Sequence, residues 1–282
     1  MALNKATGAG ALQPSAINDL IVEPVVKDSV AAQVSTVIIG AQGSKLRIPK
    51  IADENTVSNL FTAELAEIEL LNPTVSQVEL EWRKIAALSV LSSEVIQDSE
   101  MSVLDVAGRS LTRELVRKID TAAFGDAAPA NGFAGLQSYH ALFNDGFSTD
   151  ASNADFAIEA AAAIRNVDGT PQVILTTPNV LVALQKAKVA TGSEQPLFGT
   201  SAAAAVGQTV NGLPVLTSPH VKADTLYVID PSALTFAIRR DVTLDTDSSA
   251  AFSVDGTMIR IVTRMAFGVV EPSKISVIDY TP

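Results

Sequence analysis

The 282-residue sequence predicts an α+β fold, and three patterns along the chain indicate it. A long amphipathic helix is expected over residues 99–124, because apolar residues recur there every three or four positions. Apolar and polar residues alternate strictly over 78–83, which is the period of a β-strand. Strand and helix signals then alternate between residues 156 and 229, which is typical of an α/β module.

The composition excludes several classes of protein. Apolar residues make up 47% of the chain and charged residues 18%, so a sizeable core can be buried and a disordered chain is excluded. There is no cysteine and there are two histidines, which excludes disulfides, thiolate zinc sites and multi-histidine metal centres. The net charge of −11 has the wrong sign for binding nucleic acid through bulk charge. No run of about 18 apolar residues occurs, so no membrane contact is expected.

The chain is expected to begin with an arm. Residues 1–13 are rich in alanine and glycine and have the composition of a flexible segment. Residues 31–40 are β-branched and apolar, and they predict a first strand.

A long protruding β-hairpin is expected next, over residues 43–84. Two extended limbs, 45–51 and 78–82, flank a polar middle, and Trp82 is expected to pack at the base. Between Lys50 and Arg83 the chain has seven acidic residues and no basic one. A hairpin this long and this one-sided in charge is not expected to be stable alone in water, so it requires a partner surface.

The helix expected over 99–124 carries a basic stripe. Arg109, Arg113 and Arg117 are each four positions apart and therefore share one face. The commoner interpretation of such a stripe is a solvated helix face. The charge of the hairpin favours a second interpretation, a track on which acidic residues of another chain dock. The residues expected between subunits are Glu64, Glu67, Glu69, Glu79, Glu81, Arg109, Arg113 and Arg117.

A loop at 126–150 and an α/β module follow the helix. The module is expected to contain helices at 156–164 and 178–190, short strands at 173–175 and 226–229, and a tight turn at Asn211-Gly212. Two long strands, 234–244 and 258–270, and a last strand at 275–278 are expected to complete the fold.

No catalytic, cofactor-binding or metal-binding residue is expected. The segment 40–45 has the wrong spacing for a phosphate-binding loop. His140 and His220 both lie beside turn residues and are expected to be satisfied or exposed loop side chains rather than bases. Asp245 and Asp247 start like a calcium loop, but Ser249 stands where a stronger ligand is needed.

The order of these parts resembles the tailed-phage major capsid protein family, which has the Hong Kong ninety-seven capsid fold. The segments that carry the resemblance are LIVEPVV (20–26), LRIP (46–49), the run 88–115, ILTTP (174–178) and MAFGVVEP (265–272). The resemblance implies an N-terminal arm and first strand (1–42), an extended loop (43–84), an axial domain (126–224), and a peripheral domain with a spine helix (85–125 and 225–282). It also implies that the loop 245–256 approaches three-fold junctions.

The same resemblance implies a structural protein rather than an enzyme. Such a chain self-assembles into the hexamers and pentamers of an icosahedral shell that encloses phage DNA without sequence specificity. The extended loop of each subunit overlaps its neighbour. Portal, scaffolding and decoration proteins are further implied partners, with no cofactor. The implied location is the virion capsid, assembled in the cytoplasm of the host bacterium.

Two departures from the family pattern lead to expectations of their own. Some members join a lysine of the extended loop to an asparagine of a neighbour. Here no lysine lies between Lys50 and Lys84, and the position of the asparagine falls near Ala250 or Ala251, so no cross-link is expected. Some members begin with a cleaved scaffolding segment. None precedes Met1 in this sequence, so scaffolding is expected from a separate protein or from a segment trimmed from this chain.

Three other interpretations remain open at this point. An encapsulin, the shell protein of a bacterial nanocompartment, has a related fold and binds the tails of cargo enzymes. An α/β enzyme would require a polar cluster in a pocket, and the sequence reveals none. A tail or adhesin protein would usually show more β-repeats.

Overall fold

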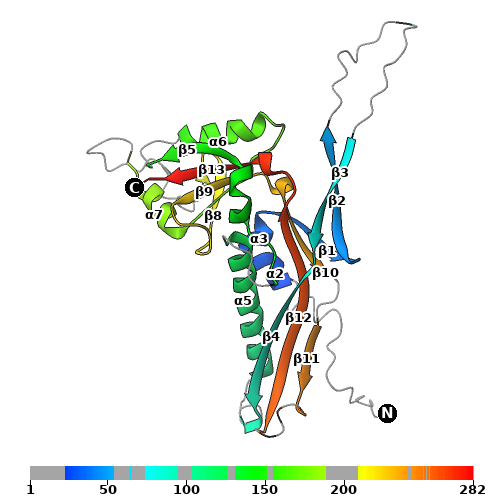
Figure 1. The fold of residues 1–282 in the computed structure, drawn as a ribbon. Helices are drawn as coiled ribbons and strands as arrows, with labels where there is room; N and C mark the ends of the chain where they lie inside the picture. The colour runs from blue at the N-terminus through cyan, green and yellow to red at the C-terminus, as the bar shows by residue number, and fades with distance from the viewer. Residues whose placement is uncertain are drawn as a thin grey trace.

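The computed structural model describes residues 23–53, 64, 74–94, 103–125, 131–150, 155–188, 209–239, 243–249, 251, 253 and 255–281. Helix α5 (Val103–Phe124) runs alongside the long strand β12 (Gly256–Val269), and a six-stranded sheet lies across one end of both (Figure 1). Strands β2 (Lys45–Asp53) and β3 (Thr74–Glu81) pair antiparallel and project from the body as a hairpin. The predicted α+β fold is confirmed.

A five-stranded sheet is built around β12. Strand β4 (Arg83–Ser92) pairs along one side of β12. Strands β10 (Leu234–Arg239) and β11 (Thr243–Asp247) share the other side, one after the other. Strand β1 (Thr36–Ala41) pairs in parallel with β10. One continuous segment at 234–244 was expected, and the chain divides it into β10 and β11.

The two faces of this sheet differ. Ile259, Ile261 and Phe267 of β12 lie in the main core together with Leu115 and Ile119 of α5. The residues between them in sequence point to the opposite face, because side chains alternate along a strand. We call this second face, which α5 does not cover, the outer face.

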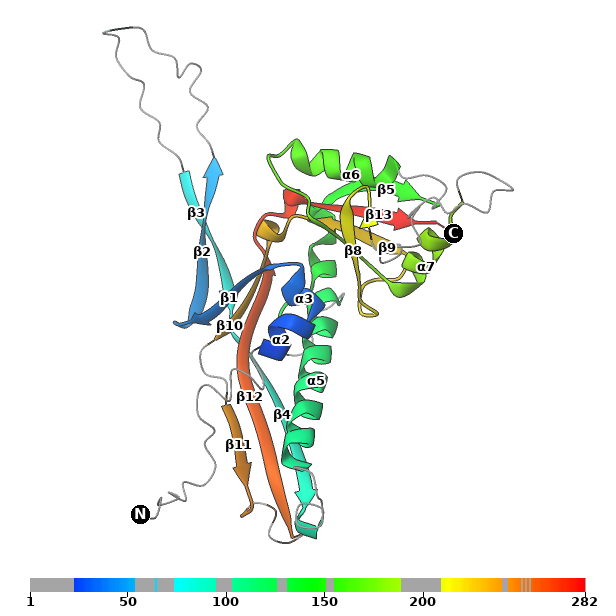
Figure 2. The same cartoon turned by 180° about the vertical axis from the view of Figure 1, so that it is seen from behind.

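Two short helices lie against α5 near its C-terminal half, α2 (Glu23–Asp28) and α3 (Val30–Gln33) (Figure 2). The strand expected over 31–40 is therefore wrong in its first half, where α3 forms instead, and β1 begins at Thr36. The reason is tertiary. The carboxylate of Asp120 in α5 accepts hydrogen bonds from the backbone N–H groups of Val30 and Ala31 and so caps α3 from another element.

The six-stranded sheet has the order β5-β13-β9-β6-β8-β7. Its strands are β5 (Asn144–Thr149), β6 (Val173–Thr176), β7 (Thr209–Val210), β8 (Leu213–Thr217), β9 (Thr225–Ile229) and β13 (Ile275–Tyr280). Helices α6 (Asp155–Arg165) and α7 (Pro178–Lys186) contribute to the second apolar core that this sheet forms. The tight turn predicted between β7 and β8 is confirmed, because Asn211 (φ 51°) and Gly212 (φ 81°) are both left-handed.

Strand β13 lies in a different sheet from the one expected. The domain bounds implied by the resemblance grouped all of 225–282 with the long helix, whereas β13 pairs with β9 and β5, and β9 pairs with β6 as the α/β module predicts. Strand β13 begins with a run of four buried residues, 275–278. Such a run indicates burial but does not identify the partner strand. The 3-10 helix η2 (Leu136–Leu142) and β5 also occupy the expected loop at 126–150.

Two 3-10 helices form the junction between the sheets. Helix η3 (Pro231–Ala233) leads from β9 to β10, and η5 (Pro272–Lys274) leads from β12 to β13. The N–H of Val270 donates to the carbonyl of Ala233 at 2.8 Å, which bonds one connection to the other. The carboxylate of Asp230, which is 2% exposed, accepts from the N–H groups of Thr170 at 2.8 Å and Ser232 at 2.9 Å.

Asp230 at the junction is expected to make the stability of the subunit depend on pH. Burial raises the pKa of Asp230, but the hydrogen bonds from Thr170 and Ser232 outweigh it, and the pKa lies below its ordinary value. Asp230 therefore stabilises the fold above its unfolded pKa of about 3.9, and this contribution is lost as the pH falls through the lower folded pKa. We expect Asp230→Asn to lower the urea midpoint of the unassembled subunit at neutral pH. The difference from wild type should shrink toward about pH 3, and a difference that stays constant with pH would contradict the prediction.

Candidate functional site

The projecting hairpin has an apolar face and a charged face. Leu46 lies opposite Leu80 in the cross-strand register, and Ile48 lies opposite Val78. These four side chains pack with Ile38, Ala237, Ala266 and Trp82, so the root of the hairpin rests on the outer face of the five-stranded sheet. The predicted position of Trp82 at the hairpin base is confirmed.

The charged face of the hairpin is paired within the chain. The carboxylate of Glu79 lies 2.9 Å from Nζ of Lys45 and 3.0 Å from Nε of Arg47, and Glu81 lies 2.8 Å from Nη2 of Arg83. The hydrogen bond from Lys45 lowers the pKa of Glu79. Glu79 and Glu81, which were expected between subunits, form ion pairs with basic residues of their own chain in the single subunit.

The remaining acidic candidates lie in sequence between β2 and β3. Glu64 is an exposed turn residue, while Glu67 and Glu69 lie outside the described residues. Lys45, Arg47 and Arg83 compensate the carboxylates at the root of the hairpin. The other acidic residues between Lys50 and Arg83 lie between residues 53 and 69, where the sequence has no basic residue.

The arginine stripe is exposed on α5. Arg109, Arg113 and Arg117 are solvent-exposed residues at successive turns of the helix. Glu114 lies 4.0 Å from Arg117 and 3.7 Å from Lys118 on the same helix. Exposed pairs at this spacing are weak, so the stripe keeps its positive character.

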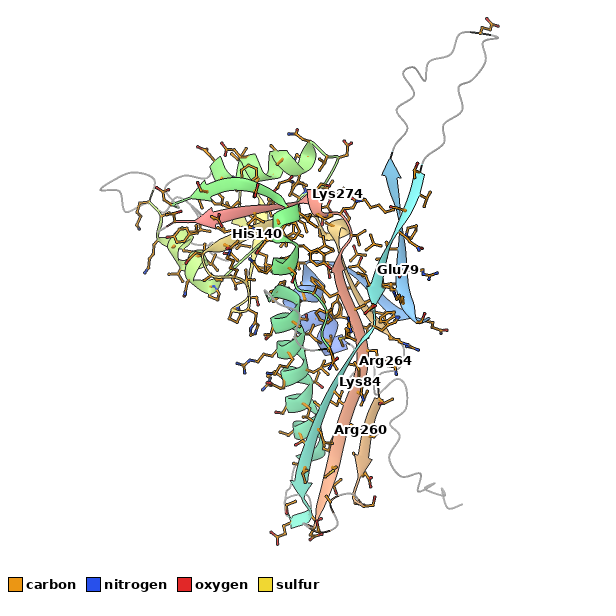
Figure 3. The ribbon with its side chains drawn as sticks, in the orientation of Figure 1. Glu79, Lys84, His140, Arg260, Arg264 and Lys274 are labelled. Carbon is orange, nitrogen blue, oxygen red and sulfur yellow. The ribbon has the colours of Figure 1, made fainter. Side chains whose placement is uncertain are left out.

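The outer face of the sheet carries a second basic group. Lys84 of β4 lies directly opposite Arg264 of β12, and Arg260 lies on the same face, with its Nη2 atom 2.8 Å from Oδ2 of Asp245 (Figure 3). Exposed apolar residues lie beside them, including Leu88 at 60% and Val90 at 47% exposure. This part of the outer face therefore combines exposed basic residues with exposed apolar side chains.

The sequence alone does not reveal this face. Arg260 and Arg264 are four positions apart, which places them on one face of a strand. Lys84 joins them only through the pairing of β4 with β12, between residues 180 positions apart. In the sequence, the spacing of the two arginines is the one pattern that indicates this basic group.

The rejected catalytic and metal candidates have structural partners or stand apart from one another. Nδ1 of His220 lies 3.2 Å from Oγ1 of Thr121, Asp245 pairs with Arg260, and Asp247 accepts from the backbone and hydroxyl of Ser249. Nε2 of His140 is buried without a hydrogen-bond partner in the described part of the chain. Where the structure describes the chain, no three metal-ligating side chains gather, and no helix is long and apolar enough to cross a membrane.

Comparison with known proteins agrees with this architecture. A solved structure of Microbacterium phage Oxtober96 is 16% identical over 100% of this chain and 95% of that chain, with a TM-score of 0.72. The capsid of a native GTA particle is 15% identical, with the same coverage and a TM-score of 0.68. Mycobacterium phage Adephagia is 13% identical over 90% of both chains, with a TM-score of 0.67. These likenesses show a shared fold.

At the level of sequence, no curated protein matches the chain. The model of the phage capsid family does match, and it spans residues 9–280. The match includes the hairpin, the spine-like helix α5 and both sheets. The chain therefore belongs to the phage capsid family.

Proposed function

We propose that this major capsid protein assembles with copies of itself into the hexamers and pentamers of an icosahedral shell around phage DNA. The observation that carries the proposal is the hairpin, whose root rests on its own body, while four further glutamates without a basic residue among them lie in sequence between its two strands. A projecting two-stranded element with few contacts to its own chain requires a second surface. Two basic surfaces are available for it on a neighbouring copy, the arginine stripe and the outer face.

The parts of the subunit take roles in this proposal. The hairpin (43–84) is the extended loop that overlaps a neighbour. Helix α5 and the five-stranded sheet form the peripheral domain, and the six-stranded sheet with α6 and α7 forms the axial domain. The family match favours this function over a nanocompartment shell or an α/β enzyme. Portal, scaffolding and decoration proteins are proposed as further partners, with assembly in the cytoplasm of the host.

The direct test is particle formation. The chain is purified alone and after co-expression with a candidate scaffolding protein, and both preparations are examined by light scattering and negative-stain electron microscopy. Rings or closed shells are expected because the contacts repeat around a closed symmetry. A compact monomer at every concentration under both conditions would contradict the proposal.

Reversing the charge of the arginine stripe is expected to reduce assembly. We expect Arg109→Glu with Arg113→Glu to reduce shell yield at least about tenfold, because like charges would face the acidic hairpin of the neighbour. The matched control is Arg165→Glu with Lys222→Glu, which changes the net charge equally at exposed positions outside the stripe. Yield is measured by sedimentation.

A second pair of substitutions separates the two receiving surfaces. If Lys84→Glu with Arg264→Glu blocks assembly while the stripe variant does not, the hairpin docks on the outer face instead of the stripe. Adding Glu64→Arg and Glu67→Arg should restore yield to whichever variant lost it, because the charges are then exchanged. No restoration would contradict a direct ion-pair contact.

A further inference from the structure

The outer face contains a patch of small residues where β10 and β12 pair. Ala237 lies opposite Ala266, and Thr235 lies opposite Gly268. The residues between them, Phe236 and Phe267, are large and lie in the main core on the α5 side. Where they pair, the two strands therefore present bulky side chains to the α5 side and small residues to the outer face.

Leu80 of the hairpin occupies this patch. Its side chain is 6% exposed and packs with Ala237 and Ala266. A Cβ atom added at Gly268 would lie 2.3 Å from Cδ2 of Leu80, well inside van der Waals contact. Glycine weakens the interior of a strand, so the close approach of Leu80 is the physical reason for glycine here.

Packing rather than polar contacts holds the root in place. Trp82 joins the same cluster directly after β3, and its Nε1 atom is buried with no hydrogen-bond partner among the described residues. The apolar residues of the hairpin in this cluster are Leu46, Ile48, Val78 and Leu80. Since a two-stranded hairpin is marginal by itself, the patch beneath these residues determines where the hairpin points.

We propose that Ala237, Ala266 and Gly268 form a seat that sets the angle at which the hairpin leaves the body. The position of the hairpin in the subunit follows from the packing alone, while the consequence for shell geometry rests on the proposed function. Strand residues rise about 3.3 Å each, so a tilt of about 10° at the root moves the far end of β2 by roughly 5 Å. That displacement is large enough to misplace a contact with a neighbouring subunit.

The test follows the placement of the hairpin on the unassembled subunit through the distance between two spin labels. The chain has no cysteine, so spin labels can be introduced at the exposed positions Gln77 and Ser92, through Gln77→Cys in β3 and Ser92→Cys at the end of β4. Double electron–electron resonance should give a narrow distance distribution for the otherwise unchanged chain. Gly268→Ala places a methyl group against Cδ2 of the tightly packed Leu80 side chain and is expected to tilt the hairpin. Gln77 lies three strand residues, or roughly 10 Å, from Leu80, so a tilt of about 10° should shift or broaden the distribution by about 2 Å.

Two further variants keep the test decisive. Leu80→Ala combined with Gly268→Ala should return the distribution toward its original position, which a general loss of folding would not do. Ala86→Val adds bulk to an exposed position of β4 outside the seat and should leave the distance unchanged. An unchanged distribution in Gly268→Ala, or one already as broad in the unsubstituted subunit, overturns the proposal.

Electron microscopy of the same variants gives the second readout. Gly268→Ala is expected to lose shells or to give shells of altered diameter, and the double variant to regain them. If the unsubstituted chain forms no shell but the distances behave as expected, the proposed function fails and the seat stands. If shells form normally and the distances do not change, the seat fails and the proposed function stands.

Discussion

Replacing residues 54–73 by a two-residue Asn-Gly turn is expected to abolish shell formation while leaving the subunit folded. Asp53 and Thr74 are partners in the cross-strand register, so a two-residue turn can close the shortened hairpin there. The root keeps its apolar contacts and its ion pairs with Lys45 and Arg83. The melting temperature should change by no more than about 2 °C, since no buried side chain of the described core is removed.

The loss of assembly has a specific cause in this prediction. The deleted segment contains Glu54, Glu64, Glu67 and Glu69 and no basic residue. Many weak contacts repeated around a closed lattice stabilise a shell together, so removing one contact from every subunit acts on the whole particle. Yield is measured by sedimentation and particle shape by negative-stain microscopy.

A variant of unchanged length separates the effect of the hairpin's length from the effect of its charge. Changing Glu54, Glu64, Glu67 and Glu69 to glutamine removes the charge of this segment and keeps the chain length. We expect an intermediate yield that no longer depends on salt, because screening acts only on charged contacts. Shells of normal size from the shortened variant would contradict an intersubunit role for this hairpin.

The parts of the fold that could be predicted depend on local pattern. The hairpin follows from the alternation at 78–83, and α5 from its period of three to four residues. The turn between β7 and β8 follows from Asn211-Gly212, which suits two left-handed residues. Each signal is contained in a short stretch of sequence, so no knowledge of distant contacts was needed.

The parts that could not be predicted depend on contacts between distant residues. Strand β13 is recognisable as a strand, but only its pairing with β9 and β5 assigns it to the six-stranded sheet. The charge count of the hairpin was correct, yet it did not show that Glu79 and Glu81 lie beside Lys45 and Arg83. That assignment requires the register of β2 on β3.

Helix α3 also depends on contacts between distant residues, in this case with Asp120 of α5. Asp120 of α5 is 6% exposed and accepts hydrogen bonds from Oγ of Ser29 at 2.6 Å, from N of Ala31 at 3.1 Å and from N of Val30 at 3.2 Å. These residues are separated from Asp120 by about 90 positions, so the contact ties the N-terminal helices to the long helix.

We expect Asp120→Ala to lower the free energy of unfolding of the unassembled subunit by about 3–5 kcal/mol, because it leaves buried donors without an acceptor. Ser29→Ala should cost about 1 kcal/mol, since it removes one donor and the hydroxyl that accepts from Ala32. The matched control is Asp28→Ala, an exposed carboxylate one residue from the same site, with an expected change within about 0.5 kcal/mol. Urea unfolding measures all three.

Amide hydrogen exchange shows which elements lose stability in Asp120→Ala. The amides of α2, α3 and β1 should exchange faster in Asp120→Ala, while β9 and β13 in the other sheet keep their protection, because the lost bonds hold only the first group to α5. If Asp120→Ala destabilises the subunit no more than Asp28→Ala does, the carboxylate does not hold α3, and the apolar contacts of Val25, Ala31 and Val34 with the core must be sufficient to form it.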